Sequence, residues 1–262
     1  MMLTLQNVAA VASGSVVGLS LGLIGGSGSI LAVPLLLYVV GVPSVHVAIG
    51  TSAVAVAASA AISLFGHART GHVRWPCAVT FALSGIVGAA VGAQLGKMMD
   101  GTKLLVLFGV LMIVVGGLML RPRSITNDPG LRLDRSNLPH LLPLLVAAGF
   151  GVGLLSGFFG IGGGFLIVPG LLVTTAMPLI DAIGSSLVSV TAFGITTATS
   201  YAASGLVDWQ LAGLFIFGGA IGGVAGLMAA HRLAAQKRTL TYIFASIVIV
   251  TGIYITASAL MR

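Results

Sequence analysis

Two short glycine-rich segments are the first candidates for chemistry in this chain. They are IGGSGS (Ile24–Ser29) and FGIGGG (Phe159–Gly164). Glycine runs stop a helix and leave backbone groups unpaired, which is costly in an apolar medium unless the backbone touches a ligand. A helix that restarts after the break points free N–H groups and its positive dipole end at that place, and this favours an anion. The predicted backbone contacts are Gly25, Gly26, Ser27, Gly28, Gly162, Gly163 and Gly164. Close helix packing is the alternative, because membrane helix contacts also favour glycine.

A pair of hydroxyl side chains follows each glycine segment. The pairs are Thr51 with Ser52, and Ser185 with Ser186, each directly after a glycine. Hydroxyls donate hydrogen bonds without the desolvation cost of a charge, so two facing pairs would suit a small oxyanion. Alternatively, each hydroxyl bonds a carbonyl of its own helix. The sequence leaves both interpretations open.

Few ionisable residues lie near the apolar segments. His46 and Asp181 occur at the start of a predicted helix, and His67 lies near a helix end. Histidine titrates near neutral pH, so these three residues are candidates for a proton relay. The alternatives are an ordinary helix cap for Asp181 and residence at the membrane interface for the histidines. No Lys or Arg lies in the middle of a predicted helix, so the substrate is expected to be held by N–H and O–H donors.

Signals for catalysis are missing. Gly162, Gly163 and Gly164 are not followed by the lysine of a phosphate-binding loop, and no serine or histidine lies in a nucleophile motif. The one cysteine, Cys77, excludes an internal disulfide and has no metal-ligand cluster around it. We therefore expect no catalytic residue, no metal and no cofactor.

The composition is that of a multi-spanning membrane protein. Of 262 residues, 57% are hydrophobic and 6% are charged, whereas about 25% of the residues of a soluble domain are charged. The mean hydropathy is +1.14. Several uncharged runs exceed the roughly 18 residues that a membrane-spanning helix needs. The net charge of +7 lies in the connections, as membrane orientation requires, so nucleic acid is not an expected partner.

The chain contains an internal repeat, which is the main clue to its organisation. Gly18–Leu37 aligns with Gly153–Leu172, and AIGTSAV (Ala48–Val54) aligns with AIGSSLV (Ala182–Val188). Gly85, Gly88 and Gly92 then match Gly219, Gly222 and Gly226, and these scattered glycines indicate helix packing. The predicted units are residues 1–120 and 141–262, joined by a polar linker at 121–140.

Each unit is predicted to contain a broken hairpin and three full-length helices. The hairpin consists of two apolar pieces of about 12–17 residues, which are too short to span comfortably. We expect a re-entrant hairpin, although two thin spans are an alternative. The helices are expected at about Val45–Phe65, Trp75–Leu95, Leu104–Leu120, Ala182–Ala202, Trp209–Ala230 and Leu240–Leu260.

The basic residues predict the orientation of the two units. If each hairpin returns to its starting side, the units are inverted and nine of the twelve Lys and Arg residues fall on one side. If it crosses once, the division is seven against five. The positive-inside rule prefers the returning hairpin, with both termini outside the cytoplasm and the linker inside. Inverted repeats that meet near the bilayer midplane are common in secondary transporters.

The sequence resembles the TauE/SafE family of sulfite exporters. The resemblance rests on GLIGGSGSILAVPLL with AIGTS, repeated as GFFGIGGGFLIVPGLL with AIGSS, and it extends over almost the full chain. It implies a multi-pass transporter of the bacterial or archaeal plasma membrane, with two four-helix units and about eight helices. The implied substrates are sulfite, organosulfonates or related anions. Ser27 and Ser29 replace glycines of the second segment, so the two segments are expected to contact the substrate unequally.

The predicted function is therefore secondary export of small sulfur-containing anions. The alternative is a channel-like anion facilitator, in which the paired hairpins form the constriction. An intramembrane enzyme is disfavoured because paired carboxylates, metal ligands and a serine–histidine motif are missing. The expected partners are the small anion and membrane lipid, and a homo-oligomer is compatible with the sequence.

Overall fold

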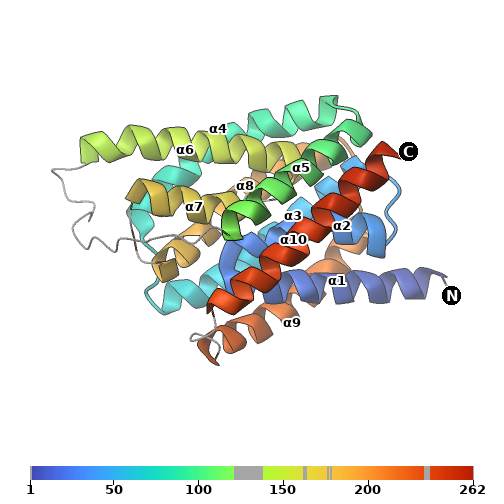
Figure 1. The fold of residues 1–262 in the computed structure, drawn as a ribbon, viewed down its shortest axis with the longest axis horizontal. Helices are drawn as coiled ribbons and strands as arrows, with labels where there is room; N and C mark the ends of the chain where they lie inside the picture. The colour runs from blue at the N-terminus through green and yellow to red at the C-terminus, as the bar shows by residue number, and fades with distance from the viewer. Residues whose placement is uncertain are drawn as a thin grey trace.

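The computed structural model describes residues 2–120, 138–161, 164–175, 177, 179–232 and 237–261. Helices make up nearly all of this part of the chain, and it contains no strand (Figure 1). The first half contains α1 (Met2–Ile24), η1 (Gly25–Leu31), α2 (Ala32–Pro34), η2 (Leu35–Val39), α3 (Val45–Arg69), α4 (Trp75–Met98) and α5 (Gly101–Leu120). The second half contains α6 (Leu138–Phe159), α7 (Gly164–Thr175), α8 (Leu179–Ala203), α9 (Trp209–Arg232) and α10 (Lys237–Leu260).

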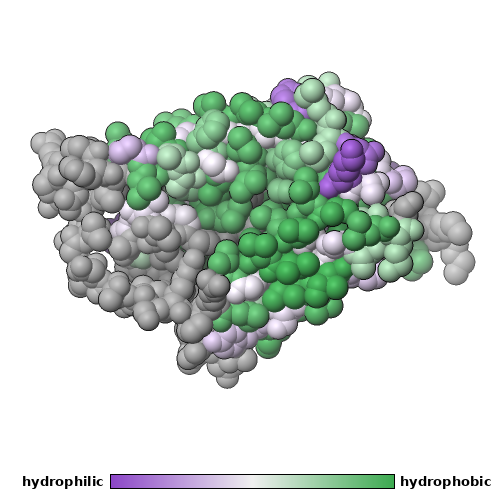
Figure 2. All heavy atoms as spheres, turned by 45° about the horizontal axis from the view of Figure 1, so that its top comes forward, coloured by the Kyte–Doolittle hydropathy of each residue, from purple (hydrophilic) through white to green (hydrophobic). Residues whose placement is uncertain are grey.

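Eight of the described helices are long and apolar enough to cross a membrane. They are α1, α3, α4 and α5 in the first half, and α6, α8, α9 and α10 in the second. Large apolar side chains on their outer faces are more than half exposed, including Leu83 and Val87 on α4 and Phe217 and Ile221 on α9. Figure 2 shows apolar atoms across the middle of one face, with the most hydrophilic residues nearer its edge. The predicted all-α membrane fold is confirmed.

Matched glycines hold the two halves together through parallel helix pairs. Gly18 of α1 lies so close to the Gly219 carbonyl of α9 that a Cβ at Gly18 would clash. The equivalent residues in the other half, Gly153 of α6 and Gly85 of α4, are equally close. Backbones approach in this way only where small residues line the contact. The scattered glycines therefore pack helices, as the sequence predicted.

Two further cross-half pairs, α3 with α8 and α5 with α10, are antiparallel. Gly50, near the start of α3, lies beside Tyr201 near the end of α8. Gly109, in the middle of α5, lies beside Thr256 late in α10, whereas Gly116, nearer the end of α5, lies beside Ala245 in the first half of α10. Each of these four helices thus runs antiparallel to its own counterpart in the other half.

Both opening segments fold back on themselves. Gly28 packs against the backbone of Ser20 and Leu21 in α1, and Gly170 of α7 approaches Val152 of α6. The outward arms are longer than predicted, because α1 has 23 residues and α6 has 22. Only the returning arms are short, as in the 12-residue α7. The glycines of these outward arms lie within continuous helices that pack on α9 and α4.

These helix directions give the molecule two ends. The terminal end contains the start of α1, the end of α10 and the loop at residues 204–208, called here the terminal-end loop. Both chain termini lie on that side in Figure 1. The linker end contains the end of α5, the start of α6 and the loop at residues 70–74, called here the linker-end loop.

Candidate substrate site

The second hairpin tip breaks and restarts as the glycines predicted. Helix α6 ends at Phe159, and Gly160 follows with a φ of 68°, a conformation that favours glycine. The Ile161 N–H donates to the Ser156 carbonyl at 3.3 Å, and α7 begins at Gly164. The predicted contacts Gly162 and Gly163 lie outside the described residues. The break thus lies directly before the N-terminus of α7, where a helix attracts negative charge.

The first tip is built differently. A 3₁₀ helix at Gly25–Leu31 follows α1 directly, and a π-helical turn at Leu35–Val39 follows a short α-helical turn. Of Gly25, Gly26 and Ser27 the structure describes the backbone alone, whereas Gly28 is buried against α1. A π turn inside a helix is often found at functional sites. The unequal tips agree with the serine-for-glycine differences in the sequence.

Ser52 and Ser186 lie in equivalent positions of α3 and α8 and make similar bonds. The Ser52 hydroxyl donates to the Ile49 carbonyl at 2.8 Å and is 3.3 Å from the Gly160 carbonyl. The Ser186 hydroxyl donates to the Ile183 carbonyl at 2.7 Å. Both therefore bond their own helix, and Ser52 also contacts the second tip. This tip contact joins α3 of one half to the hairpin of the other.

Thr51 and Ser185 fix the loops of the opposite half. The Thr51 hydroxyl accepts from the Asp208 N–H at 3.0 Å, and the Ser185 hydroxyl accepts from the Arg74 N–H at 2.9 Å. All four side chains of the two hydroxyl pairs are fully buried.

The two hydroxyl pairs do not face one another. Gly50 lies beside Tyr201, so the neighbouring Thr51 is at the same height along the α3–α8 pair as the end of α8. Ser186 lies near the start of α8, roughly 20 Å away along the helix at 1.5 Å per residue. The structure therefore places one pair toward each end of the α3–α8 helix pair.

The three residues predicted as a proton relay are dispersed. His46 Nε2 lies 3.1 Å from the Met99 carbonyl and 3.3 Å from the Gly96 carbonyl, at the terminal end. His67 is buried near the opposite end of α3, roughly 30 Å along the helix from His46. Asp181 lies in the first turn of α8 at the linker end. The structure thus does not join His46 to the other two.

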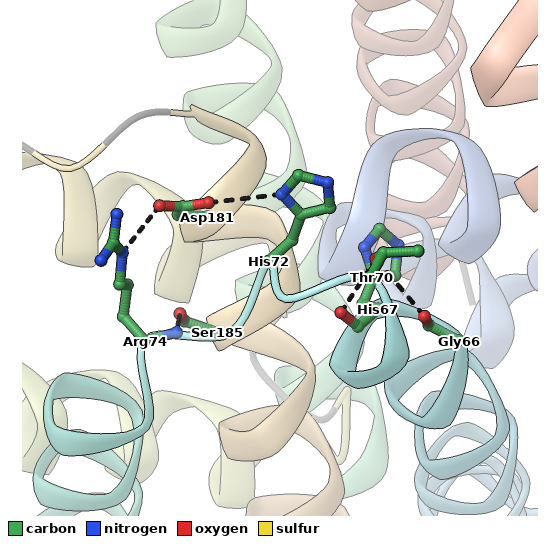
Figure 3. Close-up of polar contacts among 7 residues, drawn as sticks. All are labelled: Gly66, His67, Thr70, His72, Arg74, Asp181 and Ser185. Atoms are coloured by element: carbon green, nitrogen blue, oxygen red, sulfur yellow. Dashed lines mark hydrogen bonds and ion pairs between the residues drawn. The ribbon is translucent and has the colours of Figure 1, made fainter.

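Asp181 instead forms a charged cluster that crosses between the halves. Arg74 Nε donates to Asp181 Oδ2 at 2.8 Å, and His72 Nδ1 lies 3.5 Å from Asp181 Oδ1 (Figure 3). Asp181 is buried, and its position in the first turn of α8 favours a negative charge. No local sequence pattern connects Asp181 with His72 and Arg74, because they lie more than 100 residues apart along the chain.

A narrow apolar crevice lies between the first hairpin, α3, α5 and the second tip. It has about 170 Å³ of empty space and is too narrow to hold a water molecule. Its lining residues are Val33, Val45, Ile49, Leu104, Leu105, Phe108 and Phe159. In the described part of the chain, no group of three acidic, histidine or cysteine side chains is placed to hold a metal ion. The donors near the tips are therefore hydroxyl and backbone groups.

In the described part of the chain, eight helices long enough to span a membrane, with returning hairpins that meet between the two halves, define a multi-spanning membrane protein. The chain belongs to the TauE/SafE family, because the model of the family described as "Sulfite exporter TauE/SafE" matches residues 10–255. The resemblance found in the sequence is confirmed.

Named relatives cover nearly the whole chain. A "Probable membrane transporter protein" of Xylella fastidiosa (strain 9a5c) is 50% identical over 254 residues, which are 97% of this chain and 96% of the relative. The "Probable membrane transporter protein YunE" of Bacillus subtilis (strain 168) is 28% identical over 259 residues, covering 91% and 93%. No solved structure matches the chain.

Proposed function

We propose that this protein is a secondary transporter that exports sulfite or small organosulfonates across a prokaryotic plasma membrane. The family supports the sulfur-containing anion, because its description names sulfite export. The antiparallel pairing of α3 with α8 and of α5 with α10 supports two inverted halves. In this proposal the linker end faces the cytoplasm, since most of the basic residues then lie on the cytoplasmic side.

The contact between Ser52 and Gly160 is the observation that carries the proposed site. It links a buried hydroxyl of one half to the glycine-rich tip of the other, at 3.3 Å. The tips also meet directly, because α7 packs against η1. An oxyanion at this interface is held by tip N–H groups and by the nearby hydroxyls, which supply donors without a buried positive charge. The proposed contacts near this interface are Gly25, Gly26, Ser27, Gly28, Thr51, Ser52, Gly162, Gly163 and Gly164. Ser185 and Ser186 lie nearer the linker end, so in this proposal they contact the anion at a separate point of its path.

A carrier agrees better with the narrow crevice than a channel-like facilitator does. A carrier passes through states without a continuous water-filled path, and an apolar crevice too narrow for a water molecule suits such a state. Uptake of radiolabelled sulfite into proteoliposomes tests this proposal. We expect saturation and stimulation by sulfite preloaded inside the vesicles. Uptake that rises linearly with concentration and shows no such counterflow would favour the facilitator.

The hydroxyls are tested by substitution. We expect the double variant Ser52→Ala with Ser186→Ala to lower the transport rate on the order of tenfold, the equivalent of about 1.4 kcal/mol, while the amount of folded protein stays normal. Ser246→Ala is the control, because that exposed hydroxyl bonds the Tyr242 carbonyl of its own helix and, within the described residues, no group of the proposed site. Undiminished transport by the double variant would show that these hydroxyls do not bind the substrate.

Binding of sulfite, sulfate, thiosulfate, taurine and sulfoacetate to the purified protein would identify the preferred anion.

A further inference from the structure

The charged cluster at the linker end, drawn in Figure 3, takes no part in the proposed site. It joins Asp181 of α8 to His72 and Arg74 of the linker-end loop. By the internal repeat, Val47, Leu206 and Asp208 occupy the equivalent places at the terminal end. The cluster therefore has no counterpart at the equivalent residues of the terminal end, where Lys97 instead donates to the Ser200 carbonyl and the Ser204 hydroxyl.

We propose that Arg74, assisted by His72, is a docking site for the substrate oxyanion at the linker end. The arriving anion takes the place of the Asp181 carboxylate and releases the linker-end loop from α8. This inference depends on the proposed transport function, because the anion that docks is the transported one. It adds a cationic site outside the proposed central site, which contains no positively charged side chain.

The exposure of the two partners makes such an exchange feasible. The side chain of Arg74 is 56% exposed, whereas that of Asp181 is 10% exposed. The guanidinium group is thus accessible from the linker end, and the carboxylate lies behind it. Arginine has five N–H donors, and only its Nε donates to Asp181 here. The planar fork binds an oxyanion through two parallel bonds, so the sulfur oxyanion is well suited to compete with the carboxylate.

The same residues hold the loop closed, which couples docking to opening. The Arg74 N–H is bonded by Ser185, and the His72 carbonyl lies against Gly184 with no room for a side chain. Withdrawing the Arg74 and His72 side chains from Asp181 therefore loosens the loop from the first two turns of α8. Those turns contain Ser186, and α8 also contacts the first hairpin tip. An anion that binds more tightly when the linker-end loop is released from α8 than when the loop is packed on α8 shifts the protein toward the open form.

The chain contains its own reporter for this movement. Cys77 is the only cysteine, it is 5% exposed, and it lies in the first turn of α4 just after Arg74. A charged maleimide reacts with this thiol only when the region opens. With the purified full-length protein in nanodiscs, we expect millimolar methanesulfonate to accelerate labelling severalfold. Asp181→Asn should label rapidly without the anion, and Arg74→Gln should not respond to it.

Transport measurements complete the test. We expect Arg74→Gln to raise the half-saturating sulfite concentration roughly tenfold, because a charge-assisted pair is lost. Arg74→Lys should restore part of this loss, since it keeps the charge without the fork. Arg69→Gln is the matched control, because that exposed arginine stacks on Phe65 and lies near the same loop. Thermal unfolding of each variant separates a docking defect from a folding defect.

Two results would overturn the inference. One is wild-type labelling that is unaffected by methanesulfonate, and the other is an equal response in wild type and Arg74→Gln. Failure of the proposed function looks different. In that case sulfite is not transported, yet methanesulfonate still accelerates Cys77 labelling in a way that requires Arg74. The cluster is then a docking site for an oxyanion other than sulfite.

Discussion

The linker-end and terminal-end loops are built on the same plan but are held by different side chains. In each junction, a glycine near the start of α3 or α8 leaves room for the loop backbone to approach. The residue after that glycine accepts a hydrogen bond from a loop N–H. Gly184 and Ser185 do this at the linker end, and Gly50 and Thr51 do it at the terminal end. Even the left-handed glycines correspond, with φ of 74° at Gly71 and 69° at Gly205.

The difference lies in charge. Asp181 bonds Arg74 across the halves, whereas Asp208 accepts only from the Leu211 N–H at the start of its own helix, among the bonds described. Duplication explains the shared loop geometry, and the Arg74–Asp181 pair distinguishes the two junctions at equivalent positions. Under the proposed function, this pair would make the linker-end junction harder to open than the terminal-end junction.

The largest expected effect comes from filling the glycine contacts that the two junctions share. Gly50→Ala and Gly184→Ala should each destabilise the protein by about 2–3 kcal/mol, because the new Cβ meets the Leu206 or His72 carbonyl. Thermal unfolding in detergent measures the loss. Gly213→Ala is the control, because a Cβ there has open space. A large difference between the two junction variants would show that their shared geometry is not equally important.

Breaking the charged cluster should separate the two ends. Asp181→Asn should cost about 2 kcal/mol, which is less than a fully buried ion pair because Arg74 is partly exposed. Asp208→Asn should cost about 1 kcal/mol or less, since it weakens only a helix cap. A double-mutant cycle with Arg74→Gln measures the coupling in chemical unfolding. Equal losses of stability for Asp181→Asn and Asp208→Asn would contradict the proposal that the ion pair stabilises the linker-end junction more than the terminal-end junction.

Removing the hydroxyl acceptors should weaken both ends alike. Thr51→Val and Ser185→Ala each leave one loop N–H unpaired, and we expect a loss of about 1 kcal/mol in each case. Hydrogen exchange of the Asp208 and Arg74 amides would locate the effect. Thr80→Val serves as the control, because its exposed hydroxyl bonds only the Pro76 carbonyl of its own helix. Faster exchange at both amides after either substitution would contradict a local role.

Transplanting the cluster should have the smallest effect on stability and still change function. Val47→Asp with Asp208→Arg places the charged pair at the terminal end. We expect stability to change by less than about 1 kcal/mol, because the new pair offsets the lost cap. Sulfite transport should slow, since both ends are then held by an ion pair. Transport at the wild-type rate in well-folded protein would argue against the cluster as a brake on opening.

The fold was largely predictable from sequence because its determinants are local or repeated. Apolar runs located the spanning helices, and the repeat located the glycines that pack them. The outward hairpin arms were predicted too short. Gly14 and Gly18 resemble helix interruptions in sequence, yet they lie in α1 because α9 packs directly on their backbone. From the sequence alone, a glycine that ends a helix cannot be distinguished from a glycine that allows another helix to pack closely against it.

The site was predictable only in part. The glycine tips and the adjacent hydroxyls stand out in the sequence because each motif is short and occurs twice, and their role in binding stays a prediction. The pairing of Arg74 with Asp181 was missed for the opposite reason. The repeat aligns Asp181 with Val47 and Arg74 with Asp208, so the cluster has no second copy that could reveal it.

The parallel pairs of α1 with α9 and of α4 with α6 also constrain how the protein is made. Each opening helix finds its close-packed partner only in the other half. While the ribosome is still synthesising the second half, α1 is already inserted but has no α9 to pack against. Its row of small residues must face lipid or insertion machinery until the chain is nearly complete. Assembly of the two halves is therefore a late step of biogenesis, and a truncated chain that ends at the linker leaves α1 and α4 without their partners.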